Sequence, residues 1–228
     1  MMHTKLLKEK HRQTIQQMTD FYTPRGLHVY FKDRVIDKNI NVENVISQVE
    51  GILPQHLTSE VEMIIVGQFD EFEEKGFNAF YDSGTVFVTN LQDDEQDMID
   101  DIIHEFAHSI EEPYGMDIYG DYKVRDEFLE KRNTLHNILW KSGFKIPKSL
   151  FNNIDFDQEL DDILYRKIGY EKLQGMCKGI FLNSYAPTSL REYFATGFTD
   201  FFLRPDEHKY IQKMCPQLYK KILSIYSE

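Results

Sequence analysis

Residues 94–112 have the sequence DEQDMIDDIIHEFAHSIEE, and their spacing predicts one helix with two different faces. His104 and His108 are four residues apart, so a helix would direct both imidazoles to one side, where they could bind the same metal ion. Glu105 completes the H-E-x-x-H pattern, in which two histidines bind zinc and the glutamate is a general base. The apolar residues of the stretch share one arc that points away from both histidines and would pack into a core: Ile99, Ile102, Ile103, Phe106, Ala107 and Ile110.

The overall composition argues against several classes of partner. A net charge of −12 over 228 residues disfavours binding to nucleic acids or anionic membranes, because both would repel the chain. The length suffices for a substantial core, so we expect Cys177 and Cys215 to be ordinary buried thiols. No window is apolar enough to span a membrane, and the first residues contain no apolar secretory segment. The sequence therefore predicts a cytoplasmic protein, with secretion by a non-classical route as the alternative.

Hydrophobic periodicity and turn residues predict an α+β fold, with a small mixed sheet followed by a mostly helical second half. Strands are expected at 27–33, 61–69, 78–82 and 85–90, the last two joined through Ser83 and Gly84. Further helices are expected at 4–22, 41–53, 123–141, 157–167, 190–203 and 216–226, connected by a turn at 112–122 and loops at 142–156 and 169–187.

The chain shows no linker or repeat, which predicts a single domain over residues 1–228. Within it we expect an N-terminal helix (1–24), a sheet with the active-site helix (25–112) and a helical part that supplies a third metal ligand (113–228). Residues 85–90 directly precede the histidine-bearing helix, and we expect them to form an edge strand that a bound peptide could extend. An interior position in the sheet is the alternative.

A catalytic zinc site needs a third protein ligand, and two glutamates could supply it. Glu127 follows His108 after 18 intervening residues, a spacing known from thermolysin-like peptidases, but it also fits an ordinary charged helix face. Glu192 stands three residues after Ser189, so a capping box is the alternative role for this glutamate. The residues alone leave both glutamates open.

Three segments together resemble a known family: IIHEFAHSIEE (102–112), YAPTSLREYFATGFTDFFL (185–203) and PDEHKYIQKMCPQLYKKI (205–222). They are similar to the catalytic domain shared by anthrax lethal factor and the clostridial Pro-Pro endopeptidases, over roughly residues 60–226. The resemblance implies a zincin-like metallopeptidase of the gluzincin type, with one Zn²⁺ per chain and a peptide or protein substrate. It also implies that Glu192 is the third ligand and that Tyr185 steadies the reacting carbonyl oxygen.

The chain departs from the family pattern at two places. Where the family commonly has a second glutamate, one turn after the third ligand, this chain has Thr196. We therefore expect Asp200 or Glu111 to orient a zinc-binding histidine instead. The stretch between His108 and Glu192 is also long, which predicts an inserted helical element at 123–167.

These observations predict a zinc-dependent endopeptidase in which Glu105 activates water for peptide hydrolysis. One alternative is a non-catalytic module that binds metal or peptide without turnover. Another is a toxin-like effector protease that acts in another cell.

Overall fold

The computed structural model describes residues 20–227, which form two compact units. The boundary falls between Ser109 and Ile110, inside the long helix α4 (Glu95–Tyr119). Most of the helix expected at 4–22 lies outside the described residues, and at its end Phe21–Tyr22 form a short strand, β1, instead. Within residues 20–227, no helix has the length and apolar character needed to cross a membrane.

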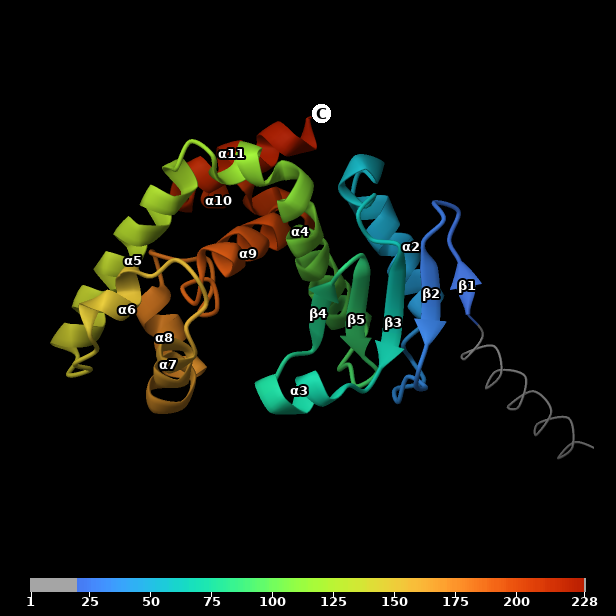
Figure 1. Ribbon diagram of the computed structural model, residues 1–228, viewed down its shortest axis with the longest axis horizontal. Coiled ribbons are helices and arrows are strands. Elements are labelled where there is room, and N and C mark those ends of the chain that lie inside the picture. Colours follow the sequence, from blue (N-terminus) through green and yellow to red (C-terminus); the bar gives the residue numbers. More distant parts are fainter. Residues whose placement is uncertain (1–19, 228) are drawn as a thin grey trace, which may run out of the picture. The chain divides into compact units, whose positions relative to one another are not determined.

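The first unit is built on a five-stranded mixed sheet with the order β1-β2-β3-β5-β4 (Figure 1). Strands β2 (His28–Phe31), β3 (Met63–Gly67) and β5 (Thr85–Thr89) run parallel to one another. β1 and β4 (Ala79–Asp82) pair antiparallel at the two edges. The four strands predicted from the sequence are therefore confirmed, and β1 is an addition to them.

The prediction that residues 85–90 form the exposed edge was wrong, because β5 is an interior strand. It pairs in parallel with β3 and antiparallel with β4, so both of its sides are hydrogen-bonded. The hairpin turn at Ser83 and Gly84, whose φ angles are +46° and +81°, reverses the chain after β4, so that β4 lies along the outer side of β5. Alternating polarity identifies both strands but carries no information on which of them is outermost.

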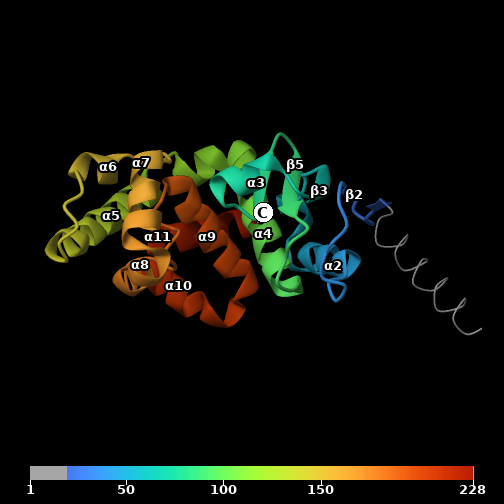
Figure 2. The same ribbon diagram turned by 90° about the horizontal axis from the view of Figure 1, so that it is seen from below.

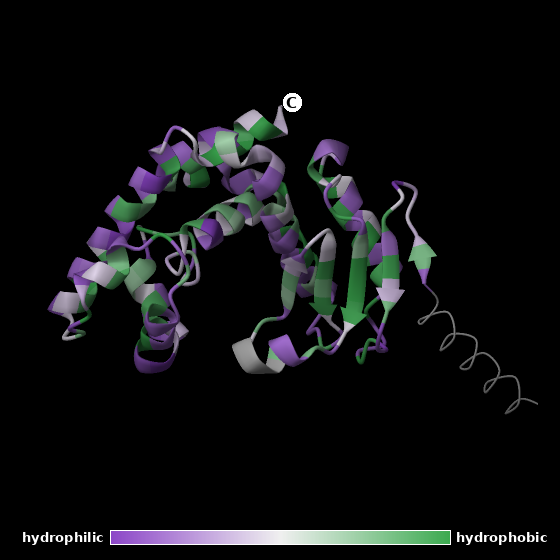
Figure 3. Cartoon of the chain, viewed as in Figure 1, coloured by the Kyte–Doolittle hydropathy of each residue, from purple (hydrophilic) through white to green (hydrophobic). Residues whose placement is uncertain are grey.

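One face of the sheet carries the core of the first unit. Val29, Ile64 and Val86 are neighbours across β2, β3 and β5, and all three are fully buried. Helix α2 (Val42–Ile52) and the first turns of α4 cover this face (Figure 2). In Figure 3, β3 and β5 are largely hydrophobic along their length, as expected of central parallel strands.

Aromatic rings cover part of the opposite face. Phe80 of β4 stacks on Phe87 of β5, with 4.5 Å between the ring centroids. Phe69, which directly precedes helix α3 (Asp70–Lys75), makes edge contacts with both rings. A 3-10 turn, Gln55–Leu57, follows α2 and precedes β3.

Helix α4 is longer than the sequence predicts. The apolar arc expected for it is buried as predicted, but the helix continues to Tyr119, where a turn at 112–122 was expected. Pro113 cannot donate a hydrogen bond to the carbonyl of Ser109, a loss that commonly ends or kinks a helix. Here Ile118, on the turns after the proline, is fully buried, and this burial offsets the missing hydrogen bond.

The second unit is helical. Helices α5 (Lys123–Lys141), α9 (Leu190–Leu203) and α11 (Pro216–Tyr226) have the bounds predicted from the sequence. The helix expected at 157–167 forms as two pieces, α7 (Gln158–Asp162) and a π-helical segment (Ile163–Ile168).

The two segments predicted as loops contain short helices. These are α6 (Lys148–Asn152) and α8 (Tyr170–Cys177). A 3-10 turn (Pro205–Glu207) and α10 (His208–Met214) precede α11. Five or eight residues provide too little periodicity to distinguish a short helix from a loop.

Aromatic side chains form the centre of this unit. The rings of Phe128, Phe181 and Tyr193 contact one another, with centroids 5.5 to 6.2 Å apart, and all three side chains are almost fully buried. Cys177 and Cys215 are buried free thiols, which confirms the prediction for them.

Candidate metal site

Helix α4 presents its two histidines on the same side. The ring centroids of His104 and His108 are 5.2 Å apart, and both residues are half-buried. The apolar arc of the helix fixes its rotation about the helix axis, because Ile102, Ile103 and Phe106 are buried in the core. The opposite side, with the imidazoles, therefore remains available for a ligand.

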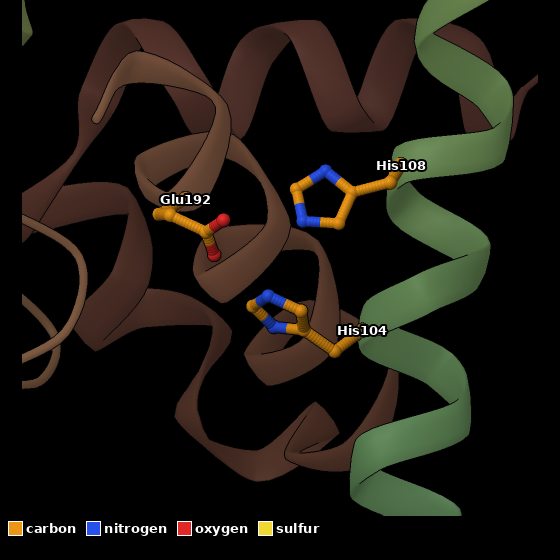
Figure 4. A group of neighbouring side chains, drawn as sticks. All are labelled: His104, His108 and Glu192. Atoms are coloured by element: carbon orange, nitrogen blue, oxygen red, sulfur yellow. The ribbon is translucent and has the colours of Figure 1, made fainter. Parts of the chain in front are cut away.

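Glu192, in the first turn of α9, completes a group that could hold a metal ion. His104, His108 and Glu192 each offer one ligand atom, and these three atoms all lie within 4.8 Å of one another. In Figure 4 the carboxylate of Glu192 points toward both imidazole rings. Two imidazoles and one carboxylate are a donor set of catalytic zinc sites, which leave one coordination position for water. Within residues 20–227, this is the one group of three or more His, Cys, Asp or Glu residues with such geometry.

The N-terminus of α9 shows how Glu192 is presented. Ser189 is the N-cap, and its Oγ accepts a hydrogen bond from the backbone N–H of Glu192 at 3.1 Å. The capping interaction expected from the sequence is thus present for the backbone of Glu192. Because it uses the N–H of Glu192, this cap is compatible with a ligand role for the carboxylate.

Glu127, the alternative third ligand, is engaged elsewhere in the second unit. Its Oε1 accepts a hydrogen bond from the hydroxyl of Tyr193 at 2.9 Å, and its Oε2 accepts one from the backbone N–H of Gln217 at 2.8 Å. The N–H of Leu218 also donates to Oε1, at 3.3 Å. These two N–H groups belong to the first turn of α11, so Glu127 acts as the cap of that helix.

Asp101, one turn before His104, is a partly buried acidic group in the first unit. Its Oδ2 accepts a hydrogen bond from Nε2 of Gln92 at 3.0 Å. Burial raises the pKa of Asp101 to about 6, and the charges of Asp100 and Glu105 add to this effect. The hydrogen bond from Gln92 and the nearby imidazole of His104 act in the opposite direction.

The two residues predicted to take part in catalysis lie in different environments. Glu105 is buried, with an exposed fraction of 7%, directly after His104 in the sequence. Tyr185 is half-buried, and its ring contacts Tyr170 of α8 at a centroid distance of 6.3 Å. Burial is the main cause that raises the pKa of Tyr170, followed by the charge of Asp161, and the charge of Glu192 is a smaller cause. The catalytic roles of Glu105 and Tyr185 stay predictions.

Thr196 stands where the resemblance would place a second glutamate, and it is buried. The side-chain oxygen of Thr196 has no hydrogen-bond partner within the described part of the chain. Of the two expected substitutes, Asp200 forms an ion pair with Arg204 at 3.0 Å. Glu111 accepts a hydrogen bond from Arg191 Nε at 2.6 Å and another from the hydroxyl of Tyr119 at 2.6 Å. The sequence did not lead us to expect that Arg191 is the partner of Glu111. Its place directly before Glu192 is the signal that could have indicated this residue.

Comparisons of the chain with models of known protein families, with curated proteins and with solved structures found no match.

Proposed function

We propose that this chain is a zinc-dependent endopeptidase. The observation that supports the proposal is the approach of His104, His108 and Glu192 to one point, on two helices that are distant in sequence. The donor set fits zinc, because it combines two neutral imidazoles with one carboxylate. The resemblance of residues 102–112 and 185–203 to the lethal factor and Pro-Pro endopeptidase family favours peptide hydrolysis over other zinc chemistry.

In the proposed reaction each side chain has a separate task. His104, His108 and Glu192 would hold the zinc ion, which would supply the acidity that lowers the pKa of a bound water toward about 7. Glu105 accepts a proton from the attacking water and delivers it to the nitrogen of the leaving amine. The hydroxyl of Tyr185 donates a hydrogen bond to the carbonyl oxygen of the scissile bond as negative charge develops on it.

The Glu105→Gln substitution tests the catalytic part of this proposal. Glutamine retains the size of the side chain but cannot accept the proton, so we expect hydrolysis to fall by about 10²- to 10⁴-fold. Zinc content should stay the same as in the native chain. Activity would be measured by mass spectrometry on a mixed peptide library, with and without added zinc. An unchanged cleavage rate would exclude Glu105 as the general base.

A second experiment tests the metal site itself. The zinc content of the native chain is compared with that of Glu192→Ala, after both have been shown to be folded. We expect about one zinc per native chain and markedly weaker binding in the variant, because a three-ligand site loses one of its donors. If the native chain binds zinc but cleaves no peptide, the result favours the non-catalytic binding module. If the variant retains zinc fully, Glu192 is not a ligand.

A further inference from the structure

Glu111 lies three residues after His108 on α4, and both of its carboxylate oxygens receive short hydrogen bonds. Arg191 Nε donates to Oε2 at 2.6 Å, and the Tyr119 hydroxyl donates to Oε1 at 2.6 Å. The side chain of Glu111 is only 10% exposed, although that of Arg191 is 62% exposed. Hydrogen bonds in which the donor or the acceptor is ionised are shorter and stronger than those between two neutral groups.

The same two helices contact each other at a second point. The ring of Tyr119 packs edge-on against Phe194 of α9, with 6.1 Å between the centroids. Burial raises the pKa of Tyr119, and the neighbouring charge and hydrogen bond of Glu111 raise it further. The hydroxyl of Tyr119 is therefore protonated at neutral pH and can donate to Glu111.

These contacts lie immediately beside two of the three candidate ligands. Glu111 follows His108 by about one helical turn, and Arg191 is the residue before Glu192. We propose that Glu111, Arg191 and Tyr119 form a clamp that joins α4 to α9 and sets the approach of Glu192 to the histidines. This inference rests on the proposed metal site, and the three are positioning residues rather than ligands.

An ordinary surface ion pair is the competing explanation, and it predicts a different result. Exposed pairs contribute about 0–1 kcal/mol to stability and have no effect on a metal site. A clamp would change metal affinity even where stability hardly changes, because carboxylates that position ligands typically alter affinity by about 10–100-fold when they are removed. Zinc affinity therefore separates the two explanations.

The test measures the zinc affinity of the full chain by competition with a chromophoric chelator. We expect Arg191→Ala and Glu111→Gln each to bind zinc about 10–100-fold more weakly than the native chain. Arg166→Ala is the matched control, because Arg166 also forms an exposed ion pair in the second unit, with Asp162 at 3.2 Å. Arg166→Ala should bind zinc as tightly as the native chain.

A double variant tests whether the two single substitutions remove the same contact. Glu111→Gln combined with Arg191→Ala should weaken zinc binding by much less than the product of the two single effects, because both remove the same contact. Arg191→Lys replaces Arg191→Ala if the alanine variant does not fold, because lysine retains the charge of the exposed side chain. Since lysine lacks Nε, this variant should also bind zinc more weakly than the native chain. Native-like zinc affinity in a folded Arg191→Ala or Arg191→Lys chain would overturn the clamp. Absence of zinc binding by the native chain would instead overturn the proposed function.

Discussion

Asp101 is an acidic group one turn before His104 whose ionisation affects the stability of the folded chain. Its pKa is raised to about 6 in the folded state, mainly by burial, from an ordinary value of 3.8. The folded state therefore binds this proton more tightly than the unfolded state. As a consequence, the contribution of Asp101 makes the protein less stable as the pH rises through the interval from about 4 to 6. One pKa unit corresponds to about 1.4 kcal/mol, so the cost at neutral pH is up to about 3 kcal/mol.

The Asp101→Asn substitution should remove this cost. Asparagine retains an oxygen that can accept the hydrogen bond from Gln92 but carries no charge, so we expect the metal-free variant to be about 1–3 kcal/mol more stable at pH 7. The difference between variant and native chain should shrink toward zero near pH 4. Urea unfolding at several pH values in the presence of a chelator measures both quantities. A difference that stays constant with pH would show that Asp101 ionises normally in the folded chain.

Glu127 illustrates how one carboxylate connects three helices. It lies on α5, accepts a hydrogen bond from Tyr193 of α9 and caps the first turn of α11 through Gln217 and Leu218. We expect Glu127→Ala to lower the free energy of unfolding by about 2–3 kcal/mol, because it removes a cap and leaves the buried Tyr193 hydroxyl without this acceptor. Zinc affinity should not change.

The matched control is Glu130→Ala, an exposed position on the same helix, which should alter stability by less than about 0.5 kcal/mol. Chemical unfolding and chelator competition on the two variants provide the comparison. A large loss of zinc affinity in Glu127→Ala alone would return Glu127 to the set of candidate ligands.

The elements that sequence reasoning predicts well are those with local signals. Helix α9 has a serine cap, α11 begins at a proline, and the hairpin between β4 and β5 turns at a glycine with positive φ. Each of these signals lies within a few residues of the boundary it determines. Features that depend on residues distant in sequence have no such local signal and were not predicted. Examples are the continuation of α4 beyond Pro113, where Ile118 is buried, and the interior position of β5, which strand pairing determines.

The candidate site likewise has one part that local sequence predicts and one part that depends on the packing of distant helices. The spacing of His104 and His108 is a local property of one helix, so the sequence alone could predict that both face one side. The choice between Glu127 and Glu192 depends on how distant helices pack. Hydrogen bonds from α9 and α11 engage Glu127, whereas the carboxylate of Glu192 lies with the histidines. No pattern within a single helix contains that information.

The three candidate ligands come together only in the folded chain, because α4 and α9 are separated in sequence by five other helical segments. A metal ion that requires all three side chains therefore binds the native state and not the unfolded one. By mass action such an ion stabilises the native state by about 2.7 kcal/mol when its free concentration is 100 times its dissociation constant. For a chain of this length, that corresponds to a rise in melting temperature of roughly 5–10 °C.

Zinc should therefore raise the melting temperature of the native chain by this amount and that of Glu192→Ala by much less. The comparison is needed because a net charge of −12 attracts any divalent cation weakly. Magnesium at the same concentration controls for that effect, since its preference for oxygen ligands makes two imidazoles a poor site. Calorimetry on both chains with each ion would show whether the rise in melting temperature comes from non-specific attraction of divalent cations or from binding at the three candidate ligands. Equal shifts with zinc in the native chain and in Glu192→Ala would mean that zinc acts at other acidic or histidine side chains, and the His-His-Glu group would then have no measurable role in folding.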